Sequence, residues 1–140
     1  MTLTRRDVFV LGSAAFAGTA LAGMPAFASA TDDLIAEFTG GAEAGSGALV
    51  LTAPEIAENG NTVPIEADAP GAVAVAIFAD GNPVPAVATF NFGPLNPSRS
   101  ASTRIRLAKS QNVIAVAKME DGSFVRADAA VKVTIGGCGG

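Results

Sequence analysis

Short apolar runs of strand length, separated by clusters of turn residues, recur from residue 49 to residue 135 and limit the possible folds most strongly. In residues 103–107, apolar and arginine side chains alternate, a pattern that gives a strand one buried and one solvated face. Residues 54–62, 80–83 and 120–122 are rich in Gly, Asn, Asp or Pro and are predicted to form turns. About seven strands are therefore expected. They cover residues 49–52, 63–69, 73–77, 86–92, 103–107, 113–119 and 124–135.

No helical pattern lies between these runs, so neighbouring strands are expected to pair antiparallel. Short strands with turn signals every 8–12 residues or so predict an all-β fold, an immunoglobulin-like antiparallel β-sandwich over residues 48–135, with an open barrel as the alternative. The sequence has no tryptophan and one cysteine, so the Trp and disulfide of an antibody-type domain are missing. With 49% hydrophobic but 6% aromatic residues, the core is expected to be small and rich in Ala and Val.

The first residues have the pattern of an export leader. Arg5 and Arg6 form a twin-arginine pair, and an uncharged apolar run follows from Val8. Small-residue cleavage patterns end at Ala28 and Ala30, so residues 1–30 are predicted to be a twin-arginine signal peptide. The mature protein is then expected in the periplasm without stable membrane insertion. An uncleaved anchor is the alternative, because the uncharged run could cross a bilayer of about 30 Å.

Residues 31–47 separate the leader from the strands. Asp32–Phe38 has acidic residues at its start and apolar residues on one face, which predicts a short amphipathic helix. Gly40 and Gly41 are expected to end that helix. The Gly- and Ala-rich stretch that follows, residues 40–47, is interpreted as a linker or an ordered loop around the sheet.

The last five residues contain the only cysteine of the chain, Cys138, between the pairs Gly136-Gly137 and Gly139-Gly140. Because glycine has the largest conformational freedom, residues 136–140 are predicted to form a flexible arm. A lone thiol in an oxidising compartment is normally capped, paired between chains or used. Cys138 is therefore predicted to be a point of covalent substrate attachment, with an intermolecular disulfide or an incidental thiol as the alternatives.

Charge and composition exclude several classes of function. The net charge of −4 disfavours binding to nucleic acid phosphates. The chain has no histidine, so it lacks the commonest general acid and base and the commonest zinc ligand. We therefore expect neither an enzyme nor a metal site, cofactor or catalytic residue. Cys138 would be a handle on which partner enzymes act.

Four stretches of the chain resemble SoxY, the sulfur-carrier subunit of the bacterial thiosulfate-oxidising Sox system. They are residues 54–64 (P-E-I-A-E-N-G-N-T-V-P), 82–92 (N-P-V-P-A-V-A-T-F-N-F), 102–109 (S-T-R-I-R-L-A-K) and 131–140 (V-K-V-T-I-G-G-C-G-G). They are spread from residue 54 to residue 140 of the mature chain, and the leader is a further point of resemblance.

The resemblance implies an immunoglobulin-like domain that forms a heterodimer with a second small β-protein, SoxZ, and carries sulfur on Cys138. It also implies three partner enzymes. SoxAX, a haem enzyme, would couple thiosulfate to the cysteine; SoxB, a hydrolase, would remove sulfate; and SoxCD, a sulfur dehydrogenase, would oxidise the cysteine persulfide that remains.

Two other classes of protein stay open from the residues alone. A structural immunoglobulin-like subunit of an exported complex would carry no covalent cargo. A ubiquitin-like sulfur carrier would also end in Gly-Gly, but the leader and Cys138 argue against it.

Two surfaces have alternative interpretations. Arg104 and Arg106 could bind an anionic cargo or an acidic partner, or simply form a solvated strand face. The apolar residues Pro83, Pro85 and 90–94 could contact a partner subunit or cap the sandwich.

Overall fold

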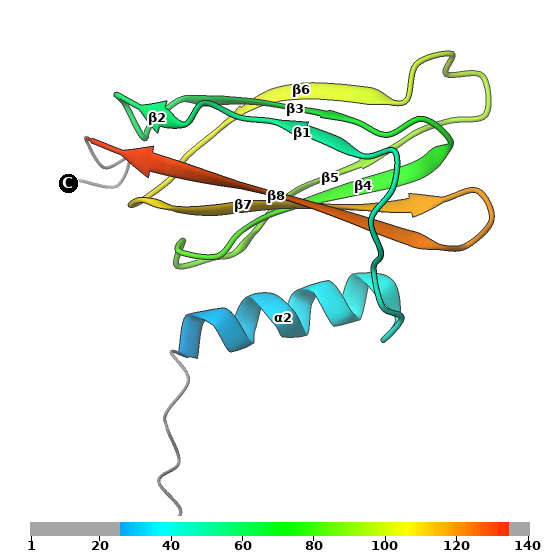
Figure 1. The fold of residues 1–140 in the computed structure, drawn as a ribbon, viewed down its shortest axis with the longest axis horizontal. Coiled ribbons are helices and arrows are strands. Elements are labelled where there is room, and N and C mark those ends of the chain that lie inside the picture. The colour runs from blue at the N-terminus through cyan, green and yellow to red at the C-terminus, as the bar shows by residue number, and fades with distance from the viewer. Residues whose placement is uncertain (1–25, 135–140) are drawn as a thin grey trace, which may run out of the picture.

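The computed structural model describes residues 26–134, which form one helix and two packed sheets (Figure 1). All the predicted strands are present within a few residues of their expected bounds. One strand, β2, was not predicted, because two residues inside an expected turn give no alternation to detect. In chain order the elements are α2 (Ala26–Thr39), β1 (Val50–Thr52), β2 (Ile56–Ala57), β3 (Val63–Asp68), β4 (Ala72–Ala79), β5 (Ala86–Asn91), β6 (Ser100–Ile105), β7 (Gln111–Met119) and β8 (Phe124–Val133).

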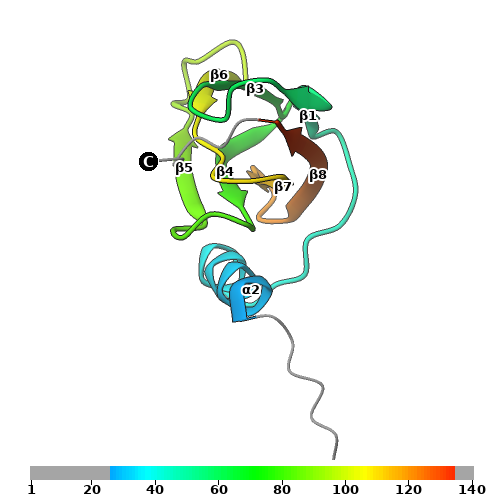
Figure 2. The same ribbon diagram turned by 90° about the vertical axis from the view of Figure 1, so that its left-hand side faces the viewer.

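The strands form a sandwich of the predicted immunoglobulin-like type (Figure 2). One sheet has three strands in the order β1-β3-β6, and the other has five in the order β2-β8-β7-β4-β5. The expectation of purely antiparallel pairing is wrong at one place, where β2 runs parallel to β8 with Ile56 opposite Lys132. After β1 the chain crosses to the edge of the second sheet and does not turn back in a hairpin. Strand β2 therefore need not run antiparallel to its neighbour.

The predicted alternation is clearest in β3, the middle strand of the smaller sheet. Val63, Ile65 and Ala67 are buried between the sheets, whereas the side chains between them are exposed. The central strands of the larger sheet differ, because nearly every residue of β4 and most of β7 are buried. These strands are covered on both faces, which explains their nearly continuous Ala, Val and Ile sequences.

Helix α2 covers the outer face of the five-stranded sheet (Figures 1 and 2). Ile35 is buried with Phe78 and Ile114 in a second cluster that is distinct from the core between the sheets. Phe38 meets Phe124 edge to face, with ring centroids 6.0 Å apart. The apolar face of the predicted helix thus packs on the sheet. The helix is longer than predicted and begins at Ala26, ahead of the expected cleavage site, which stays a prediction.

The two glycines after α2 end the helix, as predicted. Gly40 and Gly41 have φ values of 66° and 86°, and the N–H of Gly41 donates to the carbonyl of Ala36 at 2.9 Å. This is the backbone arrangement that satisfies the last carbonyls of a helix. The following loop is ordered along β8, because Gly45 donates to Phe124 O (3.0 Å) and accepts from Arg126 N (2.9 Å).

Gly40→Ala is expected to lower the free energy of unfolding by about 1–2 kcal/mol, because the left-handed backbone costs this much for a residue with a Cβ. Urea unfolding measures the change. Gly93→Ala is the matched control, since Gly93 has an ordinary φ and open space around its Cβ direction. Equal losses in the two variants would contradict the assignment of the helix end to Gly40.

Two of the three predicted turn segments, residues 80–83 and 120–122, connect consecutive paired strands. The segment around Gly81 connects β4 to β5, and Glu120–Gly122 connects β7 to β8. In the second turn the hydroxyl and the backbone N–H of Ser123 donate to the Asp121 carboxylate at 2.6 and 2.9 Å. The hydroxyl bond is the main cause of a lowered pKa of Asp121.

Candidate functional site

The predicted attachment point, Cys138, and the glycines Gly136, Gly137, Gly139 and Gly140 lie outside the described residues. The structure does place the end of β8, which these residues follow in the sequence. Strand β8 ends at Val133 beside β2, at one end of the sandwich (Figure 1). The site is therefore built from the segments that hold the end of β8.

Strand β2 holds one edge of the β8 end. The N–H of Lys132 donates to the carbonyl of Glu55 at 2.9 Å, and that of Thr134 donates to the carbonyl of Ala57 at 3.0 Å. The Thr134 hydroxyl also lies 3.4 Å from the Ala57 carbonyl and 3.3 Å from that of Glu58. The last described residue is thus tied to β2 by backbone and side chain.

Ser110 holds the opposite edge. The backbone ladder between β7 and β8 ends where Gln111 pairs with Val131. Two residues further on, the Val133 N–H donates to Ser110 Oγ at 2.8 Å, and the hydroxyl lies 3.4 Å from the Val133 carbonyl, to which it can donate. At this position β7 offers no backbone partner to Val133, and the hydroxyl of Ser110 takes its place.

The connection that carries Ser110 is itself held by Asn82, from the β4–β5 turn. Asn82 Oδ1 accepts from Ala108 N at 2.9 Å and from Gln111 Nε2 at 2.8 Å, and Asn82 Nδ2 donates to the Arg106 carbonyl at 2.8 Å. The side chain of Gln111 accepts from Gly81 N at 2.8 Å. These bonds join the β4–β5 turn to the β6–β7 connection, and the Ser110–Val133 bond joins that connection to the end of β8.

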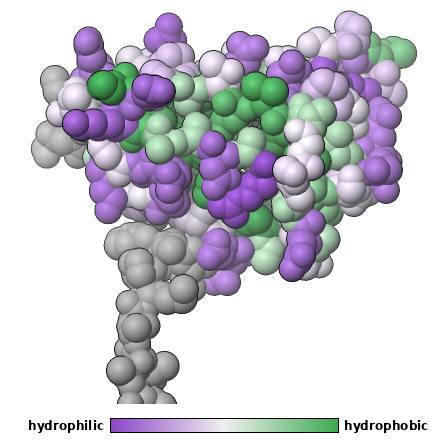
Figure 3. All heavy atoms as spheres, viewed as in Figure 1, coloured by the Kyte–Doolittle hydropathy of each residue, from purple (hydrophilic) through white to green (hydrophobic). Residues whose placement is uncertain are grey.

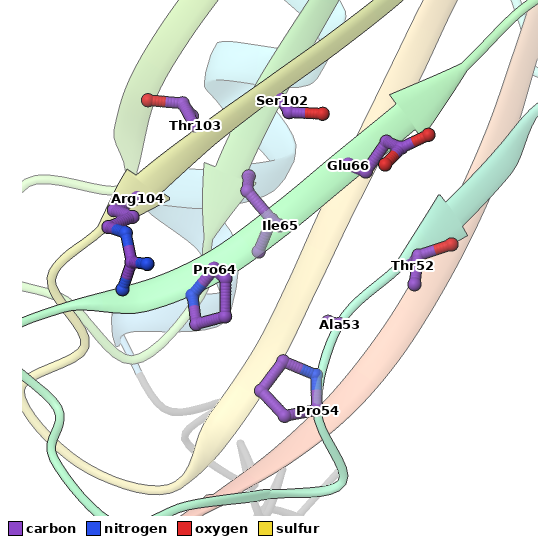
Figure 4. Close-up of a pocket in the computed structure, with 9 residues that line it drawn as sticks. All are labelled: Thr52, Ala53, Pro54, Pro64, Ile65, Glu66, Ser102, Thr103 and Arg104. Carbon is purple, nitrogen blue, oxygen red and sulfur yellow. The ribbon is translucent and has the colours of Figure 1, made fainter.

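A groove of about 570 Å³ lies on the three-stranded sheet (Figure 4). Pro54 and Pro64 line it where the chain leaves β1, and neither residue has an N–H to extend the sheet. Arg104 and Glu66 bring charges of both signs to its lining. The charges of this groove therefore do not favour an anionic ligand.

Comparison with known proteins shows the family of this chain. The family described as sulfur oxidation protein SoxY matches residues 35–138, a range that includes Cys138. The chain belongs to the SoxY family. It is similar to the structure of the sulfur carrier protein SoxY from Chlorobium limicola f thiosulfatophilum, with 40% identity and a TM-score of 0.65 over 77% of this chain and 99% of that one. SoxY family membership makes this chain a carrier protein of sulfur oxidation.

A second similarity concerns the fold alone. Superoxide reductase (neelaredoxin) from Ignicoccus hospitalis has a TM-score of 0.55 at 15% identity, over 63% of this chain and 81% of that one. A variant of the same reductase gives the same values. A comparison with curated protein sequences found no match.

The residues whose role was left open from the sequence are now placed. Arg104 and Arg106 are exposed, and Arg104 Nη1 donates to Thr62 Oγ1 at 3.4 Å. Phe90 and Phe92 pack partly against the core between the sheets, as the capping alternative expects, and Pro85 is buried, whereas Pro83 and Pro94 are exposed. Ser110 and the amide of Asn82 were not identified from the sequence, because their importance depends on what folding brings next to them.

Among residues 26–134, no cluster of His, Cys, Asp or Glu has the geometry to hold a metal ion. No helix of the same range combines the length and the apolar character that a membrane crossing requires.

Asn82→Ala is expected to lower the free energy of unfolding by about 1–3 kcal/mol, because it removes three hydrogen bonds and leaves a partly buried backbone N–H without its partner. Urea unfolding measures the loss. Asn91→Ala, at an exposed position of β5, is the control, and its free energy of unfolding should differ from that of the parent by less than about 0.5 kcal/mol. A negligible effect of Asn82→Ala would mean that the network is not needed for stability.

Proposed function

We propose that this SoxY-family carrier is exported to the periplasm and holds thiosulfate-derived sulfur covalently on Cys138. The observation that carries the proposal is the family match, which extends through the only cysteine of the chain. The position of β8 supports it. The last hydrogen-bonded residue at the end of this strand is Thr134, and the four residues from there to Cys138 would span about 13 Å if extended.

Cys138 acts as a handle in a sequence of reactions that partner enzymes perform. A SoxAX-like haem enzyme joins the cysteine sulfur to the outer sulfur of thiosulfate, and the thiol proton and two electrons leave. A SoxB-like hydrolase then adds water, releases sulfate and leaves a persulfide on Cys138. A SoxCD-like sulfur dehydrogenase oxidises the persulfide sulfur. The chain has no histidine to act as general base, which supports placing the chemistry on the partners.

A SoxZ-like β-protein completes the working carrier in this proposal. Apolar surface gathers over β1 and β8 in the middle of one face (Figure 3). Val50, on β1, is 58% exposed, whereas the exposed residues Ile56, Val84 and Leu95 lie on β2 and in the β4–β5 and β5–β6 connections. A contiguous apolar patch on an otherwise hydrophilic surface is typical of a protein interface, which supports a stable partner subunit.

The test is the intact mass of the mature protein from cells exposed to thiosulfate, before and after treatment with a thiol reductant. We expect a mass increase that the reductant removes and that fragmentation places on Cys138. The same spectrum reports whether the chain begins at Thr31, as the predicted leader requires. An unmodified cysteine during thiosulfate oxidation would instead favour the structural immunoglobulin-like subunit.

A further inference from the structure

The end of β8 is held by a side chain on one edge and by backbone on the other. Along this strand, Lys132 and Thr134 direct their N–H groups to β2, whereas the N–H of Val133 points to the opposite edge. The ladder with β7 has already ended there, since its last pair is Gln111 with Val131. The hydroxyl of Ser110 is therefore what binds the Val133 backbone on that edge.

We propose that Ser110 is a positioning residue for the carrier arm. Its hydroxyl fixes Val133 on the β7 side while Thr134 is bonded to β2, so that the end of β8 is held on both edges. This inference rests on the proposed function, because only an arm that presents Cys138 to partner enzymes needs a fixed starting point. It adds a residue for which neither the family match nor the glycine pattern provides a role.

Hydrogen bonds hold the backbone next to Ser110, and this fixes the position of its hydroxyl. Ala108 N donates to Asn82 Oδ1 at 2.9 Å, and the Lys109 carbonyl accepts from Gln111 Nε2 at 2.9 Å. Asn82 belongs to the β4–β5 turn and Gln111 to the start of β7, and the two side chains also bind each other. A hydroxyl placed by this network can hold Val133 at a constant distance from the sandwich.

Loss of the Ser110–Val133 hydrogen bond would leave the end of β8 held on one edge only. Thr134 keeps its backbone bond to Ala57, but Val133 is no longer bound on the β7 side, so the end of the strand can move about the β2 edge. A starting point that moves spreads Cys138 over a larger volume and lowers the fraction of time that it spends in the orientation that an active site accepts. The expected cost falls on productive encounter with partner enzymes and not on the chemical step.

The experiment compares Ser110→Ala with Ser110→Thr, which keeps a hydroxyl, in the mature carrier with any subunit that copurifies. Ser123→Ala is the matched control, because its hydroxyl also makes a local bond but lies at the β7–β8 turn, at the other end of β8. Two readouts are used. They are amide hydrogen exchange at Val133, and the kinetics with which the thiosulfate-coupling partner enzyme loads Cys138.

For Ser110→Ala we expect exchange at Val133 to become roughly three- to tenfold faster, the factor for one net hydrogen bond, while exchange in the core of β7 is unchanged. The KM for the carrier should rise several-fold at constant kcat. Ser110→Thr should restore both values, and Ser123→Ala should change neither.

Unchanged exchange at Val133 would show that the Ser110 hydroxyl does not hold the Val133 backbone. Faster exchange with an unchanged KM would show that Ser110 does not position the arm. Failure of the proposed function looks different. In that case the parent protein itself is not loaded at Cys138, whatever the exchange rates are.

Discussion

Cys138→Ser is expected to carry no thiosulfate-derived adduct and to reduce thiosulfate oxidation that depends on the carrier to background. The chain has no second cysteine to take over the attachment. A serine hydroxyl has nearly the same size but cannot form the sulfur–sulfur bond that the proposed cycle requires. The measurement combines intact mass with the rate of thiosulfate-dependent electron release in a mixture of the partner enzymes.

A second variant separates the presence of a thiol from its position. Cys138→Ser combined with Ser123→Cys returns one exposed cysteine to the chain, now in the β7–β8 turn. Partner enzymes are expected to leave this thiol unloaded, because it lies on the body of the sandwich and not in the predicted glycine arm. Efficient loading of the displaced cysteine would contradict the role of the arm. Normal thiosulfate oxidation by Cys138→Ser alone would contradict the carrier function of the cysteine.

Leu107→Ala is expected to lower the free energy of unfolding by about 2–5 kcal/mol and the Tm by about 10 °C or more. Leu107 is 0% exposed and belongs to the core between the two sheets. Its backbone N–H also donates to the Gly60 carbonyl at 2.8 Å, so the surrounding chain is held and can collapse only partly into the cavity. Thermal and urea unfolding of the mature protein measure the loss.

Leu95→Ala provides the control with the same chemical change. Leu95 is 94% exposed, so its truncation should alter the free energy of unfolding by no more than about 0.5 kcal/mol. A large loss for Leu95→Ala in the isolated chain would mean that this leucine packs against something in solution. A small loss for Leu107→Ala would show that the two sheets are less tightly packed than the structure indicates.

Several features could be read from the sequence because they depend on neighbouring residues. Alternation along the chain determined the strands, as in β3, because the side-chain period of a strand is a local property. The glycines after α2 and the turns at Gly81 and Gly122 were found for the same reason, since turn dihedrals depend on residue type. The only cysteine, between two pairs of glycines, and the stretches that resemble SoxY needed no coordinates.

Other features were settled only by the tertiary structure. Strand β2 exists because Glu55 and Ala57 provide carbonyls to the end of β8, and two residues carry too weak a pattern to reveal that pairing. The second buried cluster forms because α2 lies on the outer face of the sheet, although its own sequence predicts only an amphipathic helix.

The base of the arm shows the same division between sequence and tertiary structure. The sequence by itself determined that a lone thiol follows the last strand. It could not determine that the hydroxyl of Ser110 meets the backbone of Val133, 23 residues away in the chain. A serine is common on any protein surface, and its hydrogen-bond partner depends on how separate strands come together in space. Only the packing of the sheets decides where the carrier arm starts.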